Sequence, residues 1–199
     1  AVEECGRLGV PVVTVLASGF GEAGDTGALR EERLREVIAR TGVRVVGPSS
    51  LGVGNVLERL VLTANAAFAE PDLPPGRTFV ASHSGSMIGA LVSRGKARGI
   101  GFAGLVSVGN EVDLSIGEIC AATLDDSTIG GYLLFLETIR KGDYLRNFAI
   151  QAAERGKPII AYKLGRSSAA AATPGSSGTA RQAARCCTSM ASPTPVSSA

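Results

Sequence analysis

The sequence predicts an α/β fold built on a mostly parallel sheet, and two observations carry that prediction. Short β-branched apolar runs alternate along the chain with longer segments whose apolar residues recur at helical spacing. Most of these runs end in glycine and small polar residues, which are typical of the turn from a strand into a helix. Strands joined by a helix form right-handed crossovers in a parallel sheet, and ligands of such sheets lie beyond the carboxyl ends of the strands.

The first 73 residues are predicted to be part of a Rossmann-like domain. The pattern indicates a helix over 1–9, a strand over 11–16, a helix over 27–41 and a strand over 43–46. The loops after the two strands, at 17–19 and 48–50, should therefore share one rim of the sheet. Residues 53–70 alternate in polarity without a clear assignment. A nucleotide-binding domain should open with a strand and a glycine-rich loop, so we expect the missing first βα unit to lie upstream of Ala1.

A proline-rich segment at 71–76 separates this part from a second α/β series, predicted over residues 74–166. Its strands are expected at 78–81, 101–108, 132–136 and 159–164, and its helices at 87–96, 115–124 and 143–155. This alternation is typical of flavodoxin-like parallel sheets. The segments after the strands, at 82–86, 109–113, 137 and 165–168, would then meet at one rim.

The stretch 78–96 is the strongest candidate for a binding site. A short apolar run leads through Ser82-His83-Ser84-Gly85-Ser86 into an amphipathic helix. Such a turn directs the free N–H groups of the first helical turn, and the positive end of the helix dipole, at whatever lies beyond the strand. The hydroxyls and the glycine would let a phosphate approach without a lysine. An ordinary strand-to-helix turn capped by Ser84 or Ser86 would have the same local sequence.

Composition excludes several other classes of protein. Hydrophobic residues make up 45% of the 199 residues, which is enough for a buried core, and the net charge is only +2. Because no basic cluster is present, neither nucleic acid nor a membrane surface is expected as the main partner. No apolar run approaches the roughly 18 residues of a spanning helix. No signal-peptide pattern precedes the first helix, so the expected compartment is the cytoplasm.

The cysteines and the single histidine do not suggest a metal site. The cysteines are Cys5, Cys120, Cys186 and Cys187, and they have no metal-ligand spacing. The last two are adjacent, so no disulfide framework is implied. With His83 as the one histidine, a structural zinc site is not expected either.

After Arg166 the chain changes character. Ser, Ala, Thr, Pro and Gly dominate residues 167–199, and large aliphatic residues almost vanish. Such a segment cannot bury enough apolar surface to order itself, so we expect a disordered or irregular low-complexity tail.

Five short motifs follow one another along about residues 1–168. They are Gly47-Pro48-Ser49-Ser50-Leu51-Gly52, Ser82-His83-Ser84-Gly85, Val108-Gly109-Asn110, Glu137 at a strand end, and residues 158–166. In this order and spacing they resemble the α-subunit half of the NDP-forming acyl-CoA synthetases, the succinyl-CoA synthetase superfamily. The first motif is close to the family's G-P-N-C-x-G, the second matches its S-x-S-G, and the last resembles P-I-I-x-x-K-x-G-R.

The resemblance implies a CoA-binding Rossmann domain followed by a flavodoxin-like ligase domain. The family interconverts acyl-CoA, NDP and phosphate with acid, CoA and NTP, through a histidine that is phosphorylated on a loop. Coenzyme A and a small carboxylic acid would then be substrates. NDP or NTP with Mg would bind an ATP-grasp β-type subunit or domain, and a homo-oligomer is left open.

Carried over residue by residue, the resemblance also assigns site residues. The phosphate seat would consist of Ser82, Ser84, Gly85 and Ser86, and Glu137 would be the catalytic carboxylate that orients the histidine. The CoA site would be lined by both loops of the first domain, namely Leu16, Ala17, Ser18, Gly19, Pro48, Ser49 and Ser50.

The chain departs from the family pattern at three places. Ser49 and Ser50 replace the family's Asn and Cys, which would weaken contacts with CoA. His83 occupies the variable position of S-x-S-G, and we expect it to be a turn residue rather than the phosphoryl carrier. The loop with the phosphorylated histidine should follow Gly165-Arg166, but residues 172–175 read Ala-Thr-Pro-Gly.

Two explanations of the tail are open, and so are two functions. Codons for residues 172–175, read one base earlier, can spell His-Thr-Gly or His-Ala-Gly, so the tail looks like a shifted reading frame; the alternative is a natural low-complexity tail.

The chain is then either an α-type synthetase module, incomplete and inactive alone, or a non-catalytic CoA- or anion-binding regulatory module. An unrelated flavodoxin-like domain would need an acidic cluster after its first strand, which Ser82–Ser84 does not provide.

Overall fold

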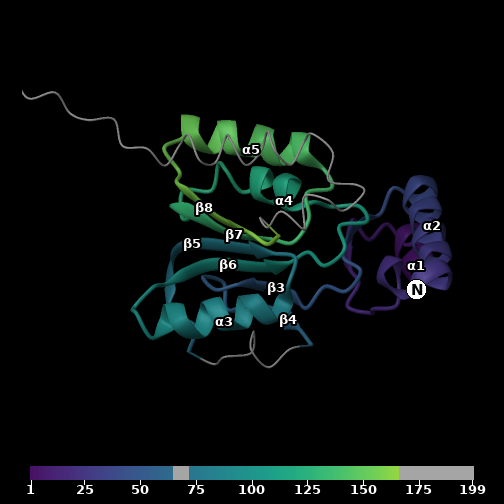
Figure 1. The fold of residues 1–199 in the computed structure, drawn as a ribbon, viewed down its shortest axis with the longest axis horizontal. Helices are drawn as coiled ribbons and strands as arrows, with labels where there is room; N and C mark the ends of the chain where they lie inside the picture. Colours follow the sequence, from purple (N-terminus) through teal and green to yellow (C-terminus); the bar gives the residue numbers. More distant parts are fainter. Residues whose placement is uncertain (65–71, 166–199) are drawn as a thin grey trace, which may run out of the picture.

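The computed structural model describes residues 1–64 and 72–165, and Figure 1 shows a small lobe beside a larger one. The small lobe contains α1 (Val2–Arg7), β1 (Val12–Thr14), the 3₁₀ turn η1 (Gly21–Ala23), α2 (Gly24–Thr41) and β2 (Arg44–Val46). β1 and β2 pair in parallel as a two-stranded sheet, with α2 as the crossover. Gly42 ends α2 in the left-handed conformation, with φ 72°.

The larger lobe is organised around one sheet. Its strands among the described residues are β3 (Gly52–Asn55), β4 (Leu60–Thr63), β5 (Pro75–Ser82), β6 (Phe102–Ser107), β7 (Gly131–Leu136) and β8 (Ile159–Lys163). Its helices there are α3 (Gly85–Lys96), α4 (Ile116–Ala122) and α5 (Gly142–Glu154). The strand order is β4-β3-β6-β5-β7-β8. β5 to β8 pair in parallel, and β3 and β4 add an antiparallel edge.

Helices cover both faces of this sheet. In Figure 1, α3 lies on one face, and α4 and α5 lie together on the other. On the α3 face, Ile88 and Val92 pack with Leu105 in a buried cluster. On the opposite face, Ile116 and Phe148 belong to a second buried cluster that includes residues of β5, β6 and β7. The central strands β6 and β7 are therefore mostly buried, which is why they read as continuous apolar runs, whereas the edge strand β8 is largely exposed.

The predicted α/β class is confirmed, and the main differences from prediction concern residues 52–76. β3 and β4 fell within the expected first domain of 1–73, but they join the larger sheet, because β3 hydrogen-bonds to β6. The two sheets are therefore divided between β2 and β3 rather than at residue 73. Pro75 and Gly76, expected in a linker, are the first residues of β5.

Some expectations fall on residues outside the described ranges. The tail of 167–199, with its shifted-frame explanation, is one of them. Within the described part, no helix is long and apolar enough to cross a membrane.

Candidate functional site

The strand order reverses at β5, and the candidate site lies there. From β5 the chain crosses by α3 to β6 on one side, and it then returns by α4 to β7 on the other side of β5. In open α/β sheets, ligands bind outside the carboxyl ends of the strands at such a reversal. The segment 83–86 directly follows β5, and Glu137 directly follows β7. The phosphate seat and the carboxylate expected from the sequence thus lie where this type of sheet binds ligands.

The turn between β5 and α3 is open on its outer side. Ser84 is the N-cap residue of α3 and makes no side-chain capping bond, so the first-turn N–H groups are left for another partner. Ser84 Oγ lies 3.0 Å from Ser86 Oγ, and Ser86 is exposed. Ser82 is different: its buried hydroxyl donates to Ser84 O (2.7 Å) and accepts from Ser84 N–H (3.0 Å). Ser82 therefore fixes the shape of the turn, while Ser84 and Ser86 face outward.

Gly85 lets the loop after β2 approach this turn closely. A Cβ on Gly85 would lie only 2.0 Å from Leu51 Cδ1, so Leu51 packs directly against the glycine. Leu51 follows Ser50, the last residue of the loop assigned to CoA. The two expected seats are therefore connected through a single side chain.

Glu137 is held through its backbone, and its carboxylate is free. The Glu137 N–H donates to His83 Nδ1 (3.0 Å), and the Glu137 carbonyl accepts from Lys163 Nζ (2.9 Å). The residue is exposed, and within residues 1–64 and 72–165 its carboxylate makes no hydrogen bond or ion pair. A carboxylate on a fixed backbone can accept a hydrogen bond from an incoming group such as an imidazole.

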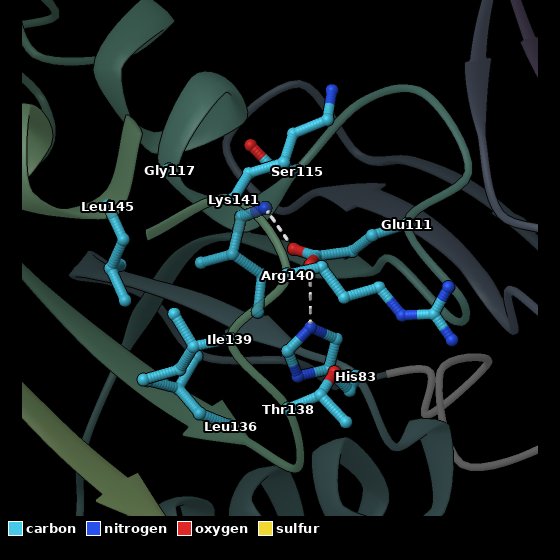
Figure 2. Close-up of a pocket in the computed structure, with 11 residues that line it drawn as sticks. His83, Glu111, Ser115, Gly117, Leu136, Thr138, Ile139, Arg140, Lys141 and Leu145 are labelled. Carbon is cyan, nitrogen blue, oxygen red and sulfur yellow. Dashed lines mark hydrogen bonds and ion pairs between the residues drawn. The ribbon is translucent and has the colours of Figure 1, made fainter. Parts of the chain in front are cut away.

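His83 lies beneath the rim, and Figure 2 shows its ring beside Glu111. Its side chain is 4% exposed, and Nε2 lies 3.1 Å from Glu111 Oε2. The two atoms are close enough for an electrostatic contact, although their geometry is not that of a hydrogen bond. Since Nδ1 accepts the Glu137 N–H, both ring nitrogens face buried protein groups. The geometry thus supports the expectation that His83 does not carry the phosphoryl group.

The two loops expected to line the CoA site run side by side. Ser49 N–H donates to Ala17 O (3.0 Å), and Ser50 N–H donates to Val15 O (3.2 Å). Ser50 is fully buried, and its hydroxyl donates to Ser107 O (2.6 Å). Ser50 therefore packs inside the loop rather than toward a ligand. Pro48 is also buried, which leaves the exposed or half-buried members as candidate contacts. These are Leu16, Ala17, Ser18, Gly19 and Ser49.

The carboxylate of Glu22 ties these loops to the larger lobe. Its Oε1 accepts from Gly19 N–H (2.7 Å) and from Ser49 Oγ (3.2 Å), and its Oε2 accepts from Asn110 Nδ2 (2.6 Å). Hydrogen bonds from its own backbone N–H, from Gly19 and from Asn110 lower the pKa of Glu22 from 4.5 to about 2, against an opposing effect of burial. The ionised carboxylate is therefore the form that the fold stabilises.

Glu22→Gln should make the protein less stable at neutral pH and remove part of its acid sensitivity. The folded pKa of Glu22 lies below its unfolded value, so its contribution is complete above pH 4.5 and is lost as the pH falls toward 2. The group is exposed, so we expect a difference of about 1 kcal/mol at pH 7 that vanishes near pH 2. Urea unfolding of both proteins between pH 7 and pH 2 measures this difference. Glu154→Gln, at an exposed position, is the control and should show no such pH-dependent difference.

A cluster of ion pairs behind the site joins four segments of the chain. Arg44 Nε and Nη2 lie 2.9 and 3.1 Å from the two carboxylate oxygens of Asp113, and Asp113 Oδ2 also accepts Val45 N–H at 2.8 Å. The hydrogen bond with Asp113 is the main cause that raises the pKa of Arg44. Glu118 accepts from Arg44 Nη2 (3.1 Å) and from Lys141 Nζ (3.1 Å). β2, the loop after β6, α4 and the loop after β7 are thereby held together.

Residues 75–192 match the family model of the succinyl-CoA ligase-like flavodoxin domain, which is more than half of the chain. The chain belongs to this family. The larger lobe is therefore its flavodoxin-like ligase domain, with α3 and the serine turn at the reversal of strand order.

Relatives of this ligase-like chain are found among acyl-CoA synthetases. The acetate–CoA ligase (ADP-forming) I subunit alpha of Pyrococcus furiosus is 35% identical over 166 residues, which are 83% of this chain and 35% of that subunit. The dinucleotide forming acetyl-coenzyme A synthetase 1 of Ca. Korarchaeum cryptofilum, in its apo form, has a TM-score of 0.80 and 31% identity, covering 92% of this chain and 40% of that one. Its complex with phosphate and ADP has a TM-score of 0.76, with 31% identity over 92% of this chain and 37% of that one. This chain thus spans well under half the length of these relatives.

Sequence reasoning did not single out Glu111 or Glu22. Glu111 follows β6, the strand beside β5, and the rim argument did place its segment, 109–113, with residues 82–86, but it gave Glu111 no role beside His83. Glu22 offered no such signal, because it lies in a loop whose path local sequence does not specify.

Proposed function

We propose that this chain is an α-type module of an NDP-forming acyl-CoA synthetase, in which the N-terminus of α3 seats a phosphoryl group beside Glu137. The observation that carries the proposal is the placement of Ser84–Ser86 and Glu137 at adjacent strand ends where the sheet order reverses. Family membership supports the chemistry, and one relative is known in complex with phosphate and ADP.

In the proposed reaction, acyl-CoA, NDP and phosphate interconvert with acid, CoA and NTP. A phosphate oxygen attacks the thioester carbonyl, the C–S bond breaks, and CoA leaves as a thiolate that takes up a proton. A histidine nitrogen then attacks the phosphorus of the acyl phosphate, and the carboxylate leaves. A terminal oxygen of NDP in turn attacks the phosphorus of the phosphohistidine, the P–N bond breaks, and NTP forms while the histidine is regenerated. The N–H groups of α3 would stabilise the phosphoryl oxygens, and Glu137 would accept a hydrogen bond from the other ring nitrogen of the histidine.

CoA is assigned to the loops around Leu16–Gly19 and Ser49, next to the phosphate seat. The nucleotide with Mg²⁺ is assigned to an ATP-grasp subunit or domain, which is supported by a relative that is itself named as a subunit alpha. A small carboxylic acid completes the substrates, and the cytoplasm is the proposed location.

The phosphorylated histidine is the part that the described residues do not supply. His83 is the only histidine of the sequence, and its ring is buried against Glu111 and Glu137. The proposal therefore needs a histidine from the tail translated one base earlier, or from another chain.

Substituting the serines of the turn tests the phosphate seat. Ser84→Ala and Ser86→Ala each remove one outward hydroxyl, and together they should weaken binding of inorganic phosphate by about tenfold. Calorimetric titration and thermal shift of the 199-residue chain measure this. Ser93→Ala, on the same helix but far from its N-terminus, should bind phosphate as the parent chain does. Equal phosphate affinity in the parent chain, in the variant with both Ser84→Ala and Ser86→Ala, and in Ser93→Ala would refute the phosphate seat.

A non-catalytic CoA- or anion-binding module is the second candidate, and the absence of a reactive histidine favours it. The two functions separate when the chain is combined with an ATP-grasp subunit and labelled ATP. A catalytic module whose tail is translated in the earlier frame takes up label, whereas a purely binding module takes up none with either tail.

A further inference from the structure

A buried histidine–glutamate pair lies directly behind Glu137, and no step of the proposed reaction uses it. The side chains of His83 and Glu111 are 4% and 5% exposed. Glu111 Oε1 accepts the N–H of Ile116 at the start of α4, at 2.7 Å. Removing a carboxylate and an imidazole from water costs free energy that their contact must offset. A pair of this kind at the ends of β5 and β6 therefore suggests a role beyond packing.

The hydrogen bond from Glu137 selects one state of the imidazole. Because His83 Nδ1 accepts the Glu137 N–H, the proton of the neutral ring is on Nε2, which faces the carboxylate of Glu111. The other tautomer would set the ring N–H against the Glu137 N–H. The Glu111 carboxylate, 3.1 Å from Nε2, attracts an N–H placed there electrostatically, without a hydrogen bond, and thus favours the tautomer in which His83 can hold Glu137.

Glu111 is itself fixed by its loop. Its backbone is in the left-handed region, with φ 51°, which directs the side chain toward the histidine seen in Figure 2. On either side of it, Asn110 N–H donates to Pro48 O (2.9 Å) and Val112 N–H donates to Gly47 O (3.1 Å). The carboxylate behind His83 is therefore anchored to the loop that is assigned to CoA.

We propose that His83 is a positioning residue, which holds Glu137 at its place beside the phosphate seat while Glu111 keeps the imidazole in the required tautomer. Lys163 holds the Glu137 carbonyl from the other side, so the two contacts together fix the backbone of Glu137. The inference rests on the proposed function, because it gives Glu137 a purpose at the seat.

Two substitutions each imitate one nitrogen of the histidine ring, so they test its contacts with Glu137 and with Glu111 separately. In His83→Asn, the amide oxygen occupies roughly the position of Nδ1, so the Glu137 N–H keeps its acceptor while the contact with Glu111 is lost. In His83→Gln, the longer amide reaches toward Glu111, and the acceptor next to Glu137 is lost. In the parent chain, ¹⁵N NMR should show a scalar coupling between the Glu137 amide nitrogen and His83 Nδ1.

Amide exchange at Glu137 and phosphate affinity are the two readouts. Exchange should stay close to that of the parent chain in His83→Asn and be faster by about tenfold or more in His83→Gln, since the partly buried hydrogen bond of the Glu137 N–H is lost. Glu137→Gln removes a negative charge beside the seat and should strengthen phosphate binding about threefold. His83→Gln should shift the affinity in the same direction, and His83→Asn should leave it unchanged.

The outcomes distinguish this inference from the proposed function. An absent coupling, or equal exchange at Glu137 in both variants, would overturn the positioning role whatever phosphate does. Failure of every protein to bind phosphate would refute the phosphate seat, while the coupling and the exchange rates would still report the contact of His83 with Glu137. Glu111→Gln offers a second route that leaves His83 intact, and faster exchange at Glu137 is expected there too.

Discussion

Gly109→Ala should lower the free energy of unfolding by about 3 kcal/mol or more and abolish CoA binding. Gly109 has φ 57°, and a Cβ there would lie 2.0 Å from Pro48 O and 2.6 Å from the carbonyl carbon of Ser49. Both of those atoms belong to the backbone, so no side-chain rotation can relieve the overlap. The loop after β6 would have to move away from the loop after β2, and the site assigned to CoA would lose its shape.

Gly99→Ala is the matched control for this substitution. Gly99 also has a positive φ, of 71°, but nothing lies within 4 Å of the position of its Cβ. Alanine there should lower the free energy of unfolding only by the left-handed backbone strain, about 1 kcal/mol. Urea unfolding of the two variants measures the difference, which is the cost of separating the loops. Equal losses would show that the loops do not touch as described.

Asp113→Ala should cost about 2 kcal/mol, because it removes several hydrogen bonds at once. Its carboxylate binds both Arg44 Nε and Nη2, at 2.9 and 3.1 Å, and also accepts Val45 N–H at 2.8 Å. The Asp113 side chain is 13% exposed, so solvent replaces these bonds poorly. Without it, the Val45 N–H loses its acceptor and, within residues 1–64 and 72–165, Arg44 keeps only Glu118 as an anionic partner.

Asp125→Ala removes an ion pair of the same length in a different environment. Asp125 Oδ1 lies 2.9 Å from Arg155 Nε, but the Asp125 side chain is 88% exposed. An exposed pair contributes between about 0 and 1 kcal/mol, so this variant should unfold almost as the parent chain does. Thermal or urea unfolding compares the two aspartates. A loss at Asp125 as large as that at Asp113 would contradict burial as the source of the effect.

Local sequence was sufficient to predict the helices and strands whose burial produces a regular pattern of apolar residues. The buried runs of β6 and β7 and the amphipathic pattern of α2 and α5 were predicted, because burial on both faces or on one stripe leaves a periodic trace in the sequence. β3 was not predicted, since it contains Gly52 and Gly54 and gains its strand structure from pairing with β6. β1 was predicted from an apolar, β-branched run, which is typical of a buried strand, yet Val12 is 50% exposed, because among the described residues β1 pairs only with β2.

The same distinction between local pattern and long-range contacts applies to the candidate site. The serine turn is local, and its strand–turn–helix pattern placed it at the rim. The contact of His83 with the Glu137 backbone joins residues 54 positions apart, and that of Glu22 with Asn110 joins residues 88 positions apart. Such contacts depend on how loops meet after the sheet has formed, and no periodicity in the sequence encodes them.

The packing of Leu51 on Gly85 also has a mechanical consequence. Leu51 belongs to the segment that leads directly from the small lobe into β3. The proposed phosphate and CoA sites are therefore joined by a tight van der Waals contact rather than by a flexible linker. Bending between them would require that contact to open. In a synthetase of the proposed kind, the flexible arm of CoA, rather than a hinge in this chain, would carry the thiol across to the acyl phosphate.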